Sequence, residues 1–159
     1  MFGKVVEGEM QLNEYGDIVV DCWLDLPKHY SNIESDYYVI MPNHMHGIIT
    51  ILVGAGLKPA PTRPLSEIVR GLKTFSSRAI NTLRGAPGKP VWQRNYYERI
   101  IRNEESLNRI REYIATNPWR WDLDRENPQA KGKDDFDRWL AAFPKPKMRI
   151  DQNGRGNPE

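Results

Sequence analysis

The sequence is poor in cysteine, in long apolar runs and in net charge. Its 159 residues include a single cysteine, Cys22, so the chain cannot form an internal disulfide, and a reducing cytoplasm fits best. No apolar run approaches the ~20 residues of a membrane helix, and the first ten residues lack the apolar core of a signal peptide. The net charge of +2 permits a nucleic-acid partner without requiring one. We therefore expect a cytoplasmic protein with no membrane partner.

Apolar residues are also scarce, at 39% of the chain, which indicates that part of it stays outside the core. The length suits one ordinary domain. We expect this domain to span residues 1–121, with a Gly/Pro-rich surface loop inserted at 54–64. Residues 122–159 read as a charged tail, partly disordered, with one short amphipathic helix in "FDRWLAAF".

Apolar periodicity and turn residues predict an α+β fold, with an antiparallel sheet and helices packed on one face. Ser66 is expected to cap the central helix, and Asn103 the last one, which should stop at Pro118. The expected elements, in order, are a strand or hairpin over 1–12, a helix over 14–28, strands over 37–42 and 44–53 joined by a tight turn, a helix over 67–83, a strand over 91–102 and a helix over 104–117.

Two of the three histidines, His44 and His46, stand one residue apart at the start of a predicted strand. Residues i and i+2 of a strand point to the same face, so both imidazoles should lie side by side. Two neutral imidazoles can supply two ligands of a divalent metal ion. The alternative is a polar, solvated face with both rings hydrogen-bonded to water. A metal site would need a third ligand from elsewhere.

The last predicted helix offers two polar groups on one face. Tyr113 and Asn117 are four residues apart, which places them one helical turn from each other. Tyr113 carries a phenolic nucleophile, and Asn117 a hard carbonyl oxygen suited to a metal. The alternative is that Tyr113 simply borders the core, because Ile110 and Ile114 fit the same helical stripe.

Two longer stretches carry a resemblance: "YYVIMPNHMHGIITI" and "VWQRNYYERIIRNEESLNRIREYIATNPWRW". In this order they resemble the single-tyrosine HUH transposases, and most of all the branch of REP-associated tyrosine transposases. The similarity covers most of residues 1–121. It implies a ferredoxin-like sheet of the HUH endonuclease type. It also implies cleavage and rejoining of single-stranded DNA at hairpin, REP-like sequences, with Mg²⁺ or Mn²⁺ as cofactor.

Carried over residue by residue, the resemblance implies that His44, His46 and Asn117 bind the metal and that Tyr113 is the catalytic nucleophile. Attack by Tyr113 on a DNA phosphate would leave a 5′-phosphotyrosine and a free 3′-hydroxyl. The implied partner is single-stranded or hairpin DNA, bound by a monomer or a homodimer. The implied location is the nucleoid of a prokaryotic cell.

Basic side chains are expected to bind the DNA backbone. Each of them, taken alone, is also explained as a solvated surface charge. The candidates are Lys73, Arg78, Arg94, Arg99, Arg102, Arg109 and Arg111.

The chain begins at "MFGKVVEGEM", whereas similar transposases carry a further strand before this point. That strand is normally central, beside the histidine strand, so its absence would leave an unpaired edge. This raises a second hypothesis, a truncated DNA-binding remnant without catalysis. A third is a metal phosphoesterase that uses water, which would need an acidic group near the histidines; Glu34 and Asp36 are the acids that precede the hairpin strand.

Overall fold

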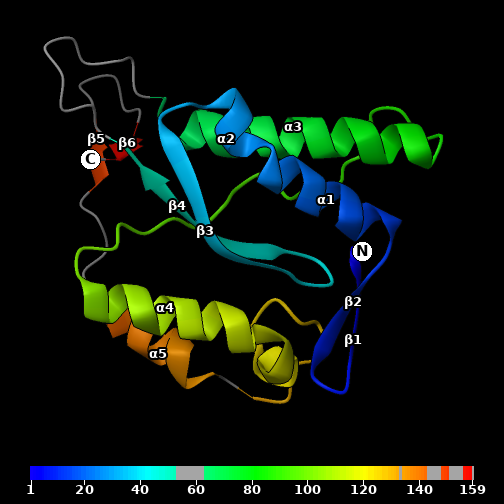
Figure 1. The fold of residues 1–159 in the computed structure, drawn as a ribbon. Helices are drawn as coiled ribbons and strands as arrows, with labels where there is room; N and C mark the ends of the chain where they lie inside the picture. Colours follow the sequence, from blue (N-terminus) through cyan, green and yellow to red (C-terminus); the bar gives the residue numbers. More distant parts are fainter. Residues whose placement is uncertain (53–62, 133, 143–147, 151–155, 159) are drawn as a thin grey trace, which may run out of the picture.

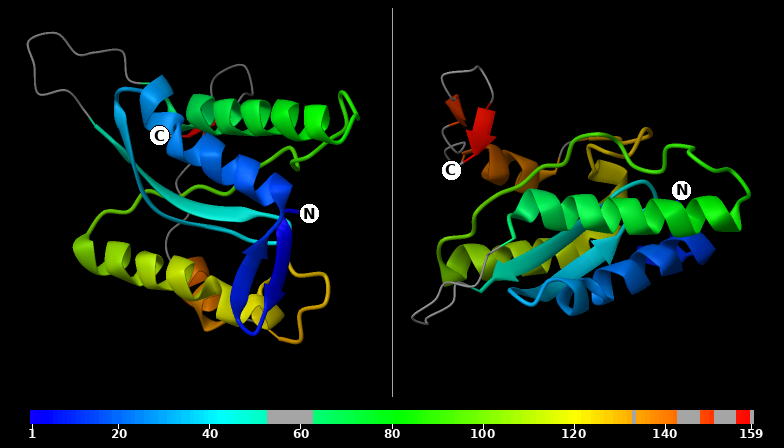
Figure 2. Two further views of the ribbon diagram at one scale, coloured as in Figure 1. Left: turned by 45° about the vertical axis from the view of Figure 1, so that its right-hand side comes forward. Right: turned by 90° about the horizontal axis from the view of Figure 1, so that it is seen from above.

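The computed structural model describes residues 1–52, 63–132, 134–142, 148–150 and 156–158. The predicted α+β class is confirmed, with antiparallel strands and helices packed against them (Figure 1). The central element is the hairpin of β3 (Ile33–Ile40) and β4 (Met45–Ile51). Helices α1 (Glu14–Leu24) and α3 (Leu65–Leu83) cover one side of it, and α4 (Glu104–Thr116) and α5 (Asp135–Ala142) lie on the other (Figures 1 and 2). The helices therefore pack on both faces of the hairpin and not on one face as predicted, because both faces of β4 carry apolar side chains.

The β3–β4 register fixes which side chains meet which helices. Ile40 pairs with Met45 and Tyr38 with Gly47, in antiparallel fashion. Because side chains alternate along a strand, Met45 and Ile49 point toward α1 and α3. Ile48 points the opposite way, into a cluster with residues of α4 and α5. His46 has the parity of Ile48, so it belongs to the α4 side.

The α1–α3 side of the hairpin contains the larger core. Buried Trp23, Leu26, Ile33, Ile68 and Leu72 form one contiguous cluster. Helix α1 starts where Asn13 Oδ1 accepts the N–H groups of Tyr15 and Gly16, both at 3.1 Å. It ends at Leu24, earlier than predicted, because Pro27 lies in the first turn of a separate short helix, α2 (Leu26–His29).

Gly47 sets how closely α1 approaches the histidine strand. A side chain at this position would overlap the indole of Trp23, so the indole lies directly on the strand backbone. The position of β4 next to the histidines therefore depends on a tryptophan from a distant helix.

The core on the α4 side of the hairpin is smaller, and it packs α4, the helix that carries Tyr113, against β4. Ile48, Tyr113, Ile114 and Phe136 are its buried members. Asn103 caps α4 as predicted, its Oδ1 accepting the Ser106 N–H at 2.8 Å. A second contact is ionic, because Arg111 of α4 donates to Asp36 Oδ2 of β3 at 2.6 and 3.0 Å.

The N-terminal residues form the predicted hairpin, β1 (Gly3–Val6) with β2 (Glu9–Leu12). Just before it, the Phe2 N–H donates to the Pro42 carbonyl at 2.8 Å, which anchors the β3–β4 turn. The tip of the hairpin reaches the 3-10 helix η1 (Asn117–Leu123), where Gly8 contacts the Trp119 ring.

The predicted strand over 91–102 is wrong, since these residues have no regular secondary structure. A strand forms only by pairing with another strand, and residues 91–102 pair with none of the described strands, although β3 and β4 each have a free edge. Two carbonyl groups of this part of the chain are bound by one α3 side chain instead. Lys73 Nζ donates to the carbonyls of Gln93 and Asn95, at 2.9 and 3.0 Å.

Smaller differences concern the segment ends. Helix α3 begins at Leu65 with Pro64 in the cap position, so Ser66 is not its cap. The predicted loop at 54–64 lies mostly outside the described residues. The short C-terminal helix is present as α5, and β5 (Met148–Ile150) pairs antiparallel with β6 (Gly156–Pro158) in the segment predicted to be disordered. Within the described ranges, none of the helices has the length and apolar character to cross a membrane.

Candidate metal site and nucleophile

His44 and His46 lie side by side at the start of β4. His44 closes the β3–β4 turn, where its carbonyl oxygen accepts the Met41 N–H at 2.8 Å. The two rings meet edge to face with their centroids 4.7 Å apart, and their Nε2 atoms are separated by 3.0 Å. The structure therefore brings the two imidazoles to one point.

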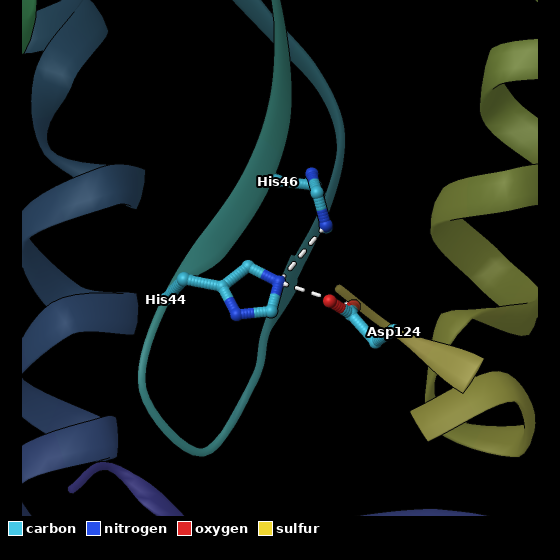
Figure 3. Close-up of side chains that lie close together, drawn as sticks. All are labelled: His44, His46 and Asp124. Atoms are coloured by element: carbon cyan, nitrogen blue, oxygen red, sulfur yellow. Dashed lines mark hydrogen bonds and ion pairs between the residues drawn. The ribbon is translucent and has the colours of Figure 1, made fainter. Parts of the chain in front are cut away.

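A carboxylate that the sequence analysis placed in the tail joins them. Asp124, just after η1, is 4% exposed, and its Oδ2 lies 3.5 Å from His44 Nε2. One ligand atom from each of His44, His46 and Asp124 lies within 4.8 Å of the other two (Figure 3). Oδ1 of Asp124 accepts the Glu126 N–H at 2.7 Å, whereas Oδ2 has no hydrogen-bond partner in the part of the chain that the structure describes.

Asn43 determines which nitrogen of His44 faces this cluster. Its Nδ2 donates to the Glu126 carbonyl at 2.6 Å, so its Oδ1 must face His44 Nδ1, 2.9 Å away. An amide oxygen only accepts, so the proton of His44 sits on Nδ1 and a lone pair is left on Nε2. Without an ion, that lone pair accepts a hydrogen bond from His46 Nε2. Hydrogen bonds of this kind commonly orient metal-ligating histidines.

The protonation states suit a cation. Burial, with the nearby His44, lowers the pKa of His46 to about 4, so this ring is neutral at physiological pH. Burial raises the pKa of Asp124, but His44, His46 and the Glu126 N–H outweigh this effect, so the net pKa is below its usual value. The cluster thus presents neutral imidazole and ionised carboxylate, the forms that bind metals.

The spacing and chemistry of these donors fit a divalent ion. Two ligands at right angles, each about 2.1 Å from an ion, are about 3 Å apart, close to the separation of the two Nε2 atoms. The buried Oδ2 of Asp124 accepts no hydrogen bond from the described residues, which is costly unless a bound group supplies one. Imidazole and carboxylate groups serve several first-row divalent metals.

Tyr113 reaches this cluster from α4. The edge of its ring meets His46 with the centroids 5.4 Å apart and the planes at 73°. Its other side stacks on Phe136 of α5, at 3.7 Å and 11°. Tyr113 is only 9% exposed, and it lines a groove shared with Arg109 and Arg120. Tyr113 does border the core, through its contact with Phe136. Its contact with His46 is additional and lies outside that alternative.

Asn117 is buried with both side-chain polar atoms unsatisfied. It is 1% exposed, and neither Oδ1 nor Nδ2 has a hydrogen-bond partner among the described residues. Its backbone is helical, so it lies one turn beyond Tyr113 on the same face. A buried amide in this state can bind a group that the polypeptide does not provide, such as an ordered water or an ion.

The sequence profile described as "Transposase IS200 like" matches residues 27–117, more than half of the chain. The chain belongs to the IS200-like transposase family. An uncharacterised protein of Haemophilus influenzae is 36% identical to it over 137 residues, which cover 79% of this chain and 76% of that protein. No solved structure matches this sequence.

The IS200-like region contains both histidines, Tyr113 and Asn117, whereas Asp124 lies beyond its end. Sequence reasoning missed Asp124 because the residues around it are charged and show no periodicity. The sequence gives one indication of such a residue: the histidine pair has no negatively charged oxygen ligand beside it, so a complete metal site needs one from elsewhere in the chain. Asp36, one of the two acids that precede the hairpin strand, instead pairs with Arg111.

The cations predicted to bind DNA fall in different places of this IS200-like transposase. Lys73, Arg78 and Arg94 line one groove beside α3. Arg109 lies near Tyr113 with its guanidinium 4.4 Å from the Trp139 ring centroid. Arg102 is exposed and Arg99 is half-buried.

Proposed function

We propose that this IS200-like transposase cleaves and rejoins single-stranded DNA at hairpin, REP-like sequences, as in the REP-associated branch. Tyr113 is the proposed nucleophile, and the intermediate is a 5′-phosphotyrosine. The observation that carries the proposal is the contact between Tyr113 and His46, which unites a phenol from α4 and a metal-type cluster from β4 in one site.

The proposed step exchanges one phosphodiester bond for another. Tyr113 Oη attacks the phosphorus and forms an O–P bond as it loses its proton. The bond from phosphorus to the 3′-oxygen breaks, and that oxygen takes up a proton to become a 3′-hydroxyl. A 3′-hydroxyl that later attacks the phosphotyrosine restores both the DNA strand and Tyr113.

The residues around the phosphate orient it and balance its charge. His44, His46 and Asp124 would hold Mg²⁺ or Mn²⁺, with the Asn117 amide as a further candidate ligand. The bound ion would polarise the phosphate. Asn43 keeps His44 Nε2 aimed into the site. Burial of Tyr113 between His46 and Phe136 limits the positions of its ring before attack.

The decisive test is covalent attachment of a labelled DNA hairpin with single-stranded flanks, in the presence of Mg²⁺ or Mn²⁺. Wild type should form a denaturation-resistant adduct, and Tyr113→Phe should form none. Tyr97→Phe is the matched control, because Tyr97 is 61% exposed and should be dispensable. An adduct that survives Tyr113→Phe would refute the assignment of the nucleophile.

Asp124 favours one second candidate, a phosphoesterase that uses water, because it is the acidic group near the histidines that this hypothesis requires. That enzyme would release cleaved DNA with no adduct, and Tyr113→Phe would retain the activity. Binding without cleavage under either metal would indicate the inactive remnant. Light scattering with and without the DNA hairpin distinguishes a monomer from a homodimer. If DNA is the partner, the protein is expected to associate with the nucleoid.

A further inference from the structure

A second charged feature lies away from the histidine cluster. A groove of about 540 Å³ runs between α3 and residues 88–96. Five cations line it, and no acidic side chain does among the described residues that form its walls. They are Arg70, Lys73, Arg78, Lys89 and Arg94. The whole chain carries +2 and these five carry +5, so the remainder carries −3.

The wall opposite α3 is fixed in place although it is irregular. Asn81 Nδ2 donates to the Lys89 carbonyl at 3.0 Å, and Trp92 Nε1 donates to Ser76 Oγ at 2.9 Å. Lys73 binds the carbonyls of Gln93 and Asn95. Three side chains of α3 therefore hold residues 89–95, and the groove keeps its shape without a sheet.

Four of the five cations are available to a ligand. Arg70, Arg78, Lys89 and Arg94 are exposed, and none of them forms an ion pair within the described part of the chain. Elsewhere the protein does pair its arginines, for example Arg120 with Asp134 at 3.0 Å. Four unpaired cations facing one groove repel each other, so an anion bound between them would be stabilised.

The spacing of the cations favours an extended anion over a single phosphate. Arg70 and Arg78 lie on α3 eight residues apart, which is about 12 Å along a helix axis. Two side chains at that distance can contact different, non-adjacent phosphates of one nucleic-acid strand, whereas a single small anion cannot reach both. Tyr96, 40% exposed, also lines the groove and offers a ring on which a base can stack.

We propose that this groove binds the sugar–phosphate backbone of the DNA substrate outside the cleavage site. Helix α3 and α4 lie on opposite sides of the β3–β4 hairpin, so the groove and the tyrosine are reached from different parts of the substrate (Figures 1 and 2). The proposal rests on the proposed function only in taking DNA as the substrate. Its role is affinity and positioning of the strand, not the chemistry at phosphorus.

The test measures binding of the fluorescent DNA hairpin by anisotropy over a range of NaCl concentrations. Arg70→Ala/Arg78→Ala removes two cations from the α3 wall, and Lys89→Ala/Arg94→Ala removes two from the opposite wall. Each pair should reduce the slope of log K against log[salt] by about 1.4–1.8 and weaken binding about 25- to 60-fold at ~0.1 M salt. Lys4→Ala/Lys131→Ala is the control, with the same loss of charge outside the groove.

A covalent-adduct assay at saturating DNA separates this proposal from the proposed function. Both groove variants should form the adduct as wild type does, because Tyr113 and the histidine cluster are intact. If the groove variants change the slope of log K against log[salt] but wild type forms no adduct, the result would support the groove and contradict the cleavage chemistry. Wild-type slopes and affinities in both groove variants would overturn the groove, as would slopes that change only for RNA of the same sequence. If one variant fails to fold by circular dichroism, the other decides.

Discussion

Asp124 Oδ2 lies 3.5 Å from His44 Nε2, although one residue follows a 3-10 helix and the other closes a β-turn. This distance assigns the histidine pair a charged partner that its local sequence does not contain. It also leaves two candidates for the third metal ligand, Asp124 and Asn117, which mutation can separate.

We expect Asp124→Ala to weaken Mn²⁺ binding about 100-fold or more, because it removes the buried charged donor; loss of a supporting residue alone typically costs 10- to 100-fold. Isothermal titration calorimetry measures the change. Asp122→Ala is the control, since the Asp122 side chain is 70% exposed and two residues away. Undiminished binding in Asp124→Ala, together with a loss in Asn117→Ala, would make Asn117 the third ligand instead.

Asn43→Ala should weaken Mn²⁺ binding about 10- to 100-fold without removing a ligand. The reason is that His44 Nδ1 loses its acceptor, so the proton can move to Nε2 and block the lone pair. The ¹⁵N chemical shifts of the His44 ring report the tautomer directly. A variant that binds metal normally and keeps its proton on Nδ1 would show that the turn backbone, not Asn43, orients the ring.

The metal-free protein should become more stable when Asn117 is replaced by leucine. Asn117 buries two unsatisfied polar atoms, and each costs about 1–3 kcal/mol, so Asn117→Leu should raise the free energy of unfolding by about 2–6 kcal/mol. Urea denaturation measures it. Asn81→Leu should do the opposite, because both amide atoms of Asn81 are hydrogen-bonded. A loss of stability in Asn117→Leu equal to that of Asn81→Leu would mean that Asn117 already has a partner.

Stability of the metal-free protein should fall as the pH drops from about 7.5 to 5. His46 titrates near 6.5 when unfolded and at about 4 when folded, so in this window the unfolded chain binds the extra proton. The expected loss is about 2 kcal/mol, measured by urea denaturation at both pH values. His46→Gln should remove most of this dependence. The depressed pKa of Asp124 acts only below this window, where stability is lost as that carboxylate protonates.

The parts of this protein that sequence predicts are those with local causes. The histidine pair follows from the two-residue period of a strand, and α4 follows from the Asn103 cap and its apolar stripe. Residues 91–102 have a strand-like composition, but pairing requires a partner strand from elsewhere in the chain, and the α3 residue Lys73 binds two of their carbonyls instead. The burial of Asp124 depends on where η1 directs the chain, which no local pattern encodes.

With a single cysteine, this chain cannot form an internal disulfide. A metal ion bound at the His44–Asp124 contact would provide a reversible cross-link instead. An ion shared by these two residues would tie the β3–β4 turn to the segment after η1 and close a long loop of chain. Unlike a disulfide, such an ion would bind the folded chain and not the unfolded one, so its binding free energy would add to the stability of the fold. Metal concentration would then govern resistance to proteolysis at residues 117–132 as well as the chemistry beside them.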